Sequence, residues 1–436
     1  MSISQNFPNT RPSLSINFAR SQTLDPRITF TRTTSGTRVG PDGYIEVIPA
    51  DQPRFDFDPV TGECLGLLIE ELRTNDIRNS TMQGAVAATP GTSPTYWTMG
   101  TSAGGLSREI TGVGEENGIP YIDVRWYGTA TGNPFSYLAS WPDGSNTTNS
   151  PGTYTSRYTF SSYVKVVSGT VPSSTTFILV MTNADSGSIG LNEYKVSTII
   201  SNSSVPTGNL IDNRFALTNT DFSNTNTAYF KPYYQWNVPN GTSFDVTIRI
   251  GLPQMEEGSF MTSVIPTSGS TVTRTADNAS ITGSNFTEWY NPSEGTVYTQ
   301  FKTELNITNN IWSINNYPAT TFGIINNYFR LLTLSNTIHT QYNVAGTNLY
   351  PTFSLTSNNS QRVIQSYNIN SSPITSTLNG TIGTGSGNIY ATSPGFNQLE
   401  FGKSVDARNT KSQYTISQLI YYPTALPSNQ LVTLTK

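Results

Sequence analysis

Hydrophobic and polar residues alternate along much of the chain, with the two-residue period of a half-buried β-strand. The alternation is clearest at 158–166, 176–181 and 243–250, and turns rich in Gly, Ser, Asn and Pro separate these segments. Strands at this spacing are typical of a β-sandwich. We therefore predict a first sandwich over residues 85–270.

The same pattern returns after residue 290. Strands are predicted at 295–301, 328–331, 361–364 and 414–422. The run 374–380 ends in Asn-Gly, the strongest short hairpin signal. A second sandwich is expected over 290–436, with a linker at 271–289. Neither a long amphipathic helix nor a short-period repeat is visible, so the predicted fold class is all-β with two β-sandwich (jelly-roll) domains.

Residues 1–84 have a different pattern. Short apolar pieces at 28–30 and 44–48 flank a Pro-Asp-Gly turn at 41–43. The run 65–71 fits either a buried strand or a short helix, and periodicity does not decide between them. The region has too little apolar content for a core of its own. We expect an extended attachment and assembly segment that packs on another domain or on another subunit.

Composition adds to the all-β picture. Charged residues make up 12% of the 436 residues, about half the usual share. A disordered chain normally combines high net charge with few aromatic residues. This chain has a net charge of −4 and 11% aromatic residues. It can therefore fill more than one folded core, with Thr-rich strands and Asn-, Ser- and Gly-rich turns.

Charge and cysteine content exclude several classes of partner. A nucleic-acid-binding protein would show clusters of Lys and Arg, and this acidic chain has none. Cys64 is the only cysteine, so no intrachain disulfide forms, which fits assembly in a reducing cytoplasm. The first 20 residues lack the apolar core of a signal peptide. No apolar stretch approaches the roughly 20 residues of a membrane span, so we expect no membrane insertion.

The N-terminal region carries a resemblance to a known family. The segment 18–32, FARSQTLDPRITFTR, resembles the start of a family of tailed-phage virion proteins common in phages of marine bacteria and cyanobacteria. Its most specific signature is 52–71, QPRFDFDPVTGECLGLLIEE, followed by Arg-Thr-Asn at 73–75. The resemblance covers about the first 80 residues. It implies a virion protein, often a tail fibre, a tail-tip adhesin or a capsid-attached fibre.

The later regions resemble two kinds of sandwich found in such proteins. The strand at 158–165 and the stretch GLPQMEEG at 251–258 are similar to carbohydrate-binding-module-like jelly rolls. The segments 295–298, 378–380 and 416–422 resemble concanavalin A/laminin-G-like lectin domains. Sandwiches host many functions, so the fold alone implies none of them.

Together these resemblances imply a non-catalytic structural and adhesive protein. It would be assembled in the host cytoplasm, be released by lysis, and contact other virion proteins and host cell-surface glycans. A homo-oligomer, expected to be a trimer, follows from the fibre resemblance alone. Two alternatives stay open: a capsid decoration or head-fibre protein, and a polysaccharide-degrading tailspike.

A glycosidase would need two carboxylates at a set separation. Asp56 and Asp58 lie two residues apart and fit one strand face, whereas Glu70 and Glu71 are adjacent and would point to opposite faces. The alternative is an assembly role, in which Asp56 and Asp58 pair with Arg54 or Arg73 and fix the N-terminal segment. We favour the assembly role, and expect no enzymatic activity and no catalytic residue.

Other reactive groups are few. His339 is the only histidine, too few for a triad or a His-rich zinc site, and we interpret it as a surface or half-buried residue. Cys64 adjoins an apolar run and is interpreted as a small buried hydrophobe. Calcium is an open alternative at Asp-Gly-Ser-Asn 143–146, although the same residues form an ordinary turn. No other cofactor or metal is expected.

Aromatic clusters are the candidate carbohydrate-binding residues. Sugars stack on aromatic rings, and amides bond their hydroxyls. The candidates are Trp126, Trp141, Tyr233, Tyr234 and Trp236. Adjacent strand residues alternate faces, so only some can share a surface. The alternative is that most of them belong to a core or to contacts between subunits.

Overall fold

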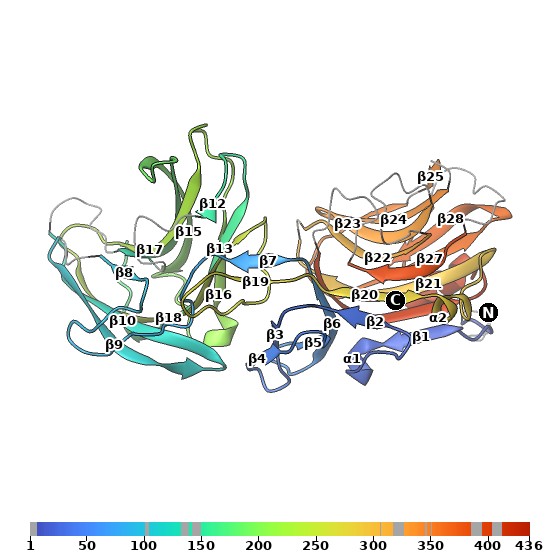
Figure 1. The fold of residues 1–436 in the computed structure, drawn as a ribbon, viewed down its shortest axis with the longest axis horizontal. Coiled ribbons are helices and arrows are strands. Elements are labelled where there is room, and N and C mark those ends of the chain that lie inside the picture. The colour runs from blue at the N-terminus through green and yellow to red at the C-terminus, as the bar shows by residue number, and fades with distance from the viewer. Residues whose placement is uncertain are drawn as a thin grey trace. The chain divides into compact units, whose positions relative to one another are not determined.

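A computed structural model describes most of the chain (Figure 1). The described residues are 7–100, 104–131, 139–141, 150–305, 307–316, 327–344, 347–349, 351–384, 395–402 and 412–436. The elements within these ranges are overwhelmingly antiparallel strands, which confirms the all-β prediction. The chain divides into two compact units. Unit 1 comprises Met1–Pro41, Ile48–Leu72 and Thr275–Lys436, and unit 2 comprises Asp42–Val47 and Arg73–Arg274.

Unit 1 is a sandwich of two sheets. In the described part of the chain, the first sheet runs β29-β28-β27-β21-β31-β6-β5, with β1 paired to β31. Its strands are β1 (Leu14–Asn17), β5 (Arg54–Phe57), β6 (Cys64–Glu70), β21 (Glu294–Thr303), β27 (Gln361–Asn368), β28 (Ser371–Leu378), β29 (Thr381–Thr384) and β31 (Gln413–Tyr422).

The second sheet of unit 1 runs β2-β20-β30-β22-β23-β24-β25, with β26 paired to β24. Its strands are β2 (Thr29–Thr31), β20 (Asn278–Thr282), β22 (Asn309–Asn315), β23 (Tyr328–Leu334), β24 (Thr337–Val344), β25 (Thr347–Leu349), β26 (Thr352–Ser354) and β30 (Gln398–Phe401). One large apolar core lies between the two sheets, with Trp312, Phe329 and Phe401 among its buried members.

Most of the N-terminal region is part of unit 1, the sandwich that contains the C-terminal strands. It supplies β1, β5 and β6 to one sheet and β2 to the other, and the short helix α1 (Phe18–Ser21) packs against β6 and β31. Ile16, Phe18 and Leu67 are buried in the same core as the C-terminal strands. Its lack of apolar content is therefore met by packing on another domain of the same chain.

A C-terminal helix covers part of the outer face of the first sheet. The helix α3 (Ser428–Thr435) packs on β27 and β28, and buries Leu431 against Tyr298, Ile364 and Tyr422. This burial of Leu431 stabilises α3, which is too short to persist as an isolated helix. The sequence analysis did not predict α3.

Unit 2 is also a sandwich of two sheets, and it contains the residues of the first predicted sandwich. Among the described residues, one sheet runs β16-β13-β18-β10-β9 and the other runs β15-β14-β17-β11-β8, with β12 paired to β17. The strands of the first are β9 (Leu106–Glu116), β10 (Ile119–Thr129), β13 (Tyr158–Gly169), β16 (Arg214–Thr218) and β18 (Ser243–Glu257). Those of the second are β8 (Thr98–Met99), β11 (Ala139–Trp141), β12 (Ser150–Pro151), β14 (Thr176–Ala184), β15 (Gly190–Ser201) and β17 (Tyr229–Asn237).

Each strand predicted from alternation is present. The run 65–71, left open between strand and helix, is β6, and the Asn-Gly turn joins β28 to β29. The predicted linker 271–289 instead contains β19 (Val272–Arg274), which pairs with β7 (Arg73–Asn75), then β20, and then α2 (Ser284–Thr287). Within the described ranges, no helix is long and apolar enough to cross a membrane.

Gly66 marks a close approach between two strands of unit 1. It has φ +113°, and a Cβ there would lie 2.1 Å from the Ile416 carbonyl oxygen of β31. Gly is the residue that tolerates both the positive φ and the missing space. The β6–β31 pairing therefore depends on Gly66.

The substitution Gly66→Ala tests this dependence. We expect the free energy of unfolding of unit 1 to fall by about 2–4 kcal/mol, because the strands must separate or the backbone must change conformation. Calorimetric unfolding measures the loss. Gly190→Ala is the matched control, since nothing lies within 4 Å of its added methyl group. Equal transition temperatures for the two variants would contradict the role of Gly66.

Candidate functional site

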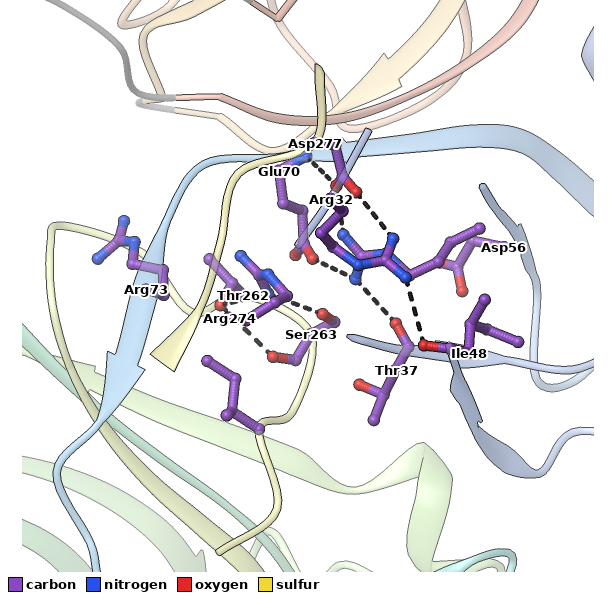
Figure 2. A network of polar contacts seen from close by, with 12 residues as sticks. Arg32, Thr37, Ile48, Asp56, Glu70, Arg73, Thr262, Ser263, Arg274 and Asp277 are labelled. Carbon is purple, nitrogen blue, oxygen red and sulfur yellow. Dashed lines mark hydrogen bonds and ion pairs between the residues drawn. The ribbon is translucent and has the colours of Figure 1, made fainter. Parts of the chain in front are cut away.

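Four charged side chains form a buried ion cluster in unit 1, which we call the Arg54 cluster: Arg32, Arg54, Glu70 and Asp277. Arg32 Nη1 lies 3.0 Å from Asp277 Oδ1, and Arg54 Nη1 lies 2.7 Å from Glu70 Oε2. Arg54 Nη2 also pairs with Asp277 Oδ2. All four side chains are fully buried. Figure 2 shows Arg32, Glu70 and Asp277 of this cluster close together.

Backbone groups complete the Arg54 cluster. Arg54 Nη1 donates to the Thr37 carbonyl oxygen at 2.9 Å, and Arg32 Nη2 donates to the Pro49 carbonyl oxygen at 2.7 Å. The Glu70 N–H donates to Asp277 Oδ2 at 2.9 Å. Two cations and two anions therefore meet with multiple hydrogen bonds, which is the condition under which buried charges are tolerated.

Burial and charge act in opposite directions on the two arginines. Burial alone disfavours the charged guanidinium of Arg54, but the Asp277 and Glu70 carboxylates outweigh it and raise its pKa. For Arg32, burial dominates and the neighbouring Arg54 adds repulsion, so its pKa is lowered. Asp277 contacts both arginines and is the residue on which the cluster depends most.

We predict that Asp277→Asn destabilises unit 1 by about 3–5 kcal/mol, because it leaves one buried positive charge without a counter-ion. The loss is measured as a lower unfolding temperature in calorimetry. Asp221→Asn is the matched control, since Asp221 pairs with Arg157 at an exposed site where ion pairs contribute little. An Asp277→Asn protein as stable as the control would contradict the proposed importance of the cluster.

Asp56 and Asp58 do not pair with arginine as predicted. Asp56 Oδ1 accepts a hydrogen bond from the Val39 N–H at 2.8 Å. Asp58 Oδ1 accepts from the N–H groups of Val60 and Thr61, both at 3.0 Å, and closes the turn before β6. The predicted pairing with Arg54 is wrong, because Arg54 pairs instead with Glu70 of β6 and with the distant Asp277. Both aspartates have a structural hydrogen-bonding role.

Asp56 carries a pH-dependent cost. Burial raises its pKa from 3.8 to about 6, the Glu70 carboxylate adds to the rise, and the Val39 hydrogen bond opposes it. Below pH 4 both folded and unfolded chains hold the proton. As pH rises from about 4 to about 6, the unfolded chain loses the proton first. The stability of the folded chain therefore falls over this window, and the cost is fully present above pH 6.

Asp56→Asn is predicted to remove that cost. The difference in unfolding free energy, variant minus wild type, should rise between pH 4 and pH 6 by about 1–3 kcal/mol. Urea unfolding at a series of pH values measures it. A difference that stays constant with pH, or that falls, would contradict the raised pKa.

Arg73, the fourth assembly candidate, belongs to unit 2. Its guanidinium lies over the Phe260 ring, 4.6 Å from the centroid, and its Nε lies 3.9 Å from Glu256 Oε2. Glu256, in β18, also accepts from the Thr262 N–H at 2.9 Å. Glu256, in the PQMEE stretch, thus makes buried polar contacts near the C-terminal end of β18. Figure 2 shows Thr262 and Ser263 beside Arg274, whose Nη1 donates to Ser263 Oγ at 2.9 Å.

Most of the aromatic candidates lie in the core of unit 2. Trp126, Tyr234 and Trp236 are at most 1% exposed. Phe177 stacks on Tyr234 with 5.9 Å between centroids, and lies 5.0 Å from Trp236. A sugar cannot reach these rings. They are core residues, which was the alternative to sugar binding. Alternation explains the placement, since all three point between the sheets.

Tyr233 points to the opposite face of the same sheet. It is 8% exposed and clusters with Ile178 and Val180, away from the main core. Trp141 lies in β11, but its side chain falls outside the described residues, as does the calcium candidate at 143–146. Tyr233 is therefore the only one of the five whose described side chain leaves the main core.

The remaining reactive groups also have local partners. His339 Nε2 lies 2.7 Å from Thr337 Oγ1, and burial lowers the pKa of the ring. Burial raises the pKa of the half-buried Cys64 thiol, which disfavours the reactive thiolate. In the described part of the chain, no group of three or more His, Cys, Asp or Glu residues could hold a metal ion.

A polar hollow of about 360 Å³ opens on the outer face of the first sheet of unit 1. We call it the Gln418 hollow. Its lining residues are Asn17, Ala19, Arg20, Gln300, Ser417 and Gln418. It joins the N-terminal segment, through the end of β1 and α1, to β21 and β31 of the C-terminal segment. Its volume lies at the lower end of the range for small-molecule sites.

Strand register explains why three amides meet in the Gln418 hollow. Gln418 of β31 lies opposite Asn17 of β1 and opposite Gln300 of β21. Directly opposite residues in antiparallel strands share a face. The next row, with Ile16 opposite Leu419, belongs to the core. The amide row therefore points away from the core, and spans about 10 Å across three strands.

Neither the Gln418 hollow nor Asp277 was predicted from the sequence. Asn17, Gln300 and Gln418 come from three segments far apart in the chain, and each alone resembles any polar strand residue. Arg32 lies in 18–32 and Glu70 in 52–71, the two segments that resemble the phage family, and this resemblance was the available signal for the Arg54 cluster. Nothing local distinguishes Asp277, because its partners lie more than 200 residues earlier.

Comparison with known proteins gives no family. No protein-family model matches the chain, and no curated protein matches it. Many solved structures are similar to part of it, and three of them serve as examples. The Ruminococcus gnavus IT-sialidase CBM40 bound to alpha2,3 sialyllactose is 14% identical, with a TM-score of 0.28, over 33% of this chain and 83% of that one.

The other two matches cover a smaller share of the solved chain. The NanB sialidase from Streptococcus pneumoniae is 16% identical, with a TM-score of 0.30, over 35% of this chain and 26% of that one. The binding domain of botulinum neurotoxin DC, in complex with rat synaptotagmin II, is 12% identical, with a TM-score of 0.30, over 37% and 40%. At these scores the likeness carries no argument, and the fold class rests on the strands of this chain.

Proposed function

We propose that this chain is a non-catalytic structural protein of a tailed-phage particle that contacts glycans on the host surface. The observation that carries the proposal is the role of residues 52–71, the segment with the most specific resemblance to the phage family. Its strands β5 and β6 complete the first sheet of unit 1, and its Arg54 and Glu70 are fully buried in the Arg54 cluster. A segment used in this way is a scaffold, which fits a virion component.

The hydrogen bonds and ion pairs of the candidate carboxylates support a protein without catalytic activity. Asp56 and Asp58 accept hydrogen bonds from the backbone, and Glu70 is paired with Arg54. A glycosidase acid and base need access to substrate and to water. The tailspike alternative therefore has no candidate pair among the residues that the sequence analysis weighed.

The proposal is tested on intact particles. Virions purified from a lysate are labelled with an antibody against residues 290–436 and imaged by electron microscopy. We expect labels at the tail or the tail tip, where an adhesin meets the host. Labels spread over the head would favour the decoration or head-fibre alternative. Particles that contain no copy of the chain by mass spectrometry would overturn the proposal.

A turnover assay addresses the tailspike alternative. Purified protein is incubated with host polysaccharide, and released reducing ends are measured. No release is expected from the wild type. Turnover that is lost in an Asp56→Asn and Asp58→Asn double variant would establish the enzyme instead.

A further inference from the structure

We infer that the Gln418 hollow binds an acidic saccharide, with Arg20 on its carboxylate or sulfate and the amide row on its hydroxyls. The inference rests on the proposed function and assigns a site and a ligand class to it. It replaces the aromatic cluster of unit 2 as the place where a glycan is recognised.

Charge gives the ligand class. Of the six residues that line the Gln418 hollow, one is cationic and none is acidic. The Arg20 side chain is exposed and has no ion-pair partner among the residues that the structure describes. A guanidinium presents a planar pair of donors that matches a carboxylate. A ligand with an anionic group is therefore favoured over a neutral sugar.

Free hydrogen-bonding groups give the rest of the ligand. In the described part of the chain, the half-buried Gln418 amide has no hydrogen-bond partner. Asn17 uses Oδ1 to accept from the Arg20 N–H at 2.9 Å, and its Nδ2 group donates to no other described residue. An amide offers both donors and acceptors, as vicinal hydroxyls require.

The floor of the Gln418 hollow is held in place. Gln300 Nε2 donates to Ser360 Oγ at 3.0 Å, and the Tyr298 hydroxyl donates to Gln300 Oε1 at 3.3 Å. The register between β21 and β31 shifts directly after Gln300, and the extra residue on β31 is Ser417. Ser417 Oγ donates to the Gln300 carbonyl oxygen at 3.1 Å. Bulges of this kind redirect side chains next to binding sites.

The wall of the hollow depends on the N-terminal segment. Asn17 caps the short helix α1, which ends at Gln22 in the left-handed conformation, and this places Ala19 and Arg20 beside β31. The aliphatic stem of Arg20 and the Ala19 methyl group offer the apolar contact that a sugar ring needs. The site is therefore incomplete without the segment that resembles the phage family.

The test is an array of matched acidic and neutral saccharides, including sialyllactose with lactose and oligogalacturonate with its methyl ester. The purified full-length chain is applied, and dissociation constants are then measured for the bound members. We expect binding to acidic members, at least tenfold stronger than to their neutral counterparts. Binding to no acidic saccharide on the array would overturn the inference.

Variants assign the binding to the hollow. Arg20→Gln and Gln418→Ala should each weaken it tenfold or more, and Arg20→Lys should weaken it less, because the charge remains but the planar fork is lost. Arg11→Gln is the matched control: it removes one exposed arginine of the same segment outside the hollow, and should bind as wild type. Variants at Arg20 and Gln418 that bind like Arg11→Gln would overturn the inference.

The outcome is separable from that of the proposed function. Particle labelling and mass spectrometry do not depend on Arg20 or Gln418. Tail labelling together with unchanged binding in the variants would leave the virion role standing and remove this site. Selective loss of acidic-saccharide binding, with no copy of the chain in particles, would keep the site and remove the virion role.

Discussion

The structure of unit 1 depends on two buried ion pairs, those of Asp277 with Arg54 and with Arg32. Asp277 lies directly after the chain enters unit 1 for the last time, whereas the arginines lie in the N-terminal segment. Two guanidinium groups and two carboxylates balance one another away from water. We expect such a cluster to favour this pairing of segments, because a pairing that separated the arginines from the carboxylates would leave a buried charge without a partner.

That constraint also positions the proposed saccharide site. The Arg54 cluster holds β5 and β6 in the first sheet, and Gly66 lets β6 approach β31 closely at Ile416. The register shift of β31 follows at Ser417, which lines the Gln418 hollow. α1 packs on β6 and β31 and presents Arg20. The hollow is thus the product of N-terminal and C-terminal strands that meet in one sheet.

The sequence predicted the elements better than their assembly. Alternation located β13, β14, β18, β21 and β31, because a half-buried strand leaves a local trace. It could not show that β1, β5 and β6 enter a sheet with β31, since register between distant segments has no local signal. The same aromatic residue types fill cores and stack on sugars, so the sequence could not show that Trp236 is a core residue. The amide row could not be predicted either, because it depends on the register between these distant strands.

The N-terminal strands β1, β2, β5 and β6 are an integral part of the unit 1 sandwich and not a detachable arm. Native-state hydrogen exchange, read by mass spectrometry, tests it most directly. We expect the amides of β5 and β6 to exchange with the same opening free energy as those of β21 and β27, because these strands unfold as one cooperative unit. Exchange of β5 and β6 through an opening several kcal/mol cheaper, with β21 and β27 still protected, would contradict it.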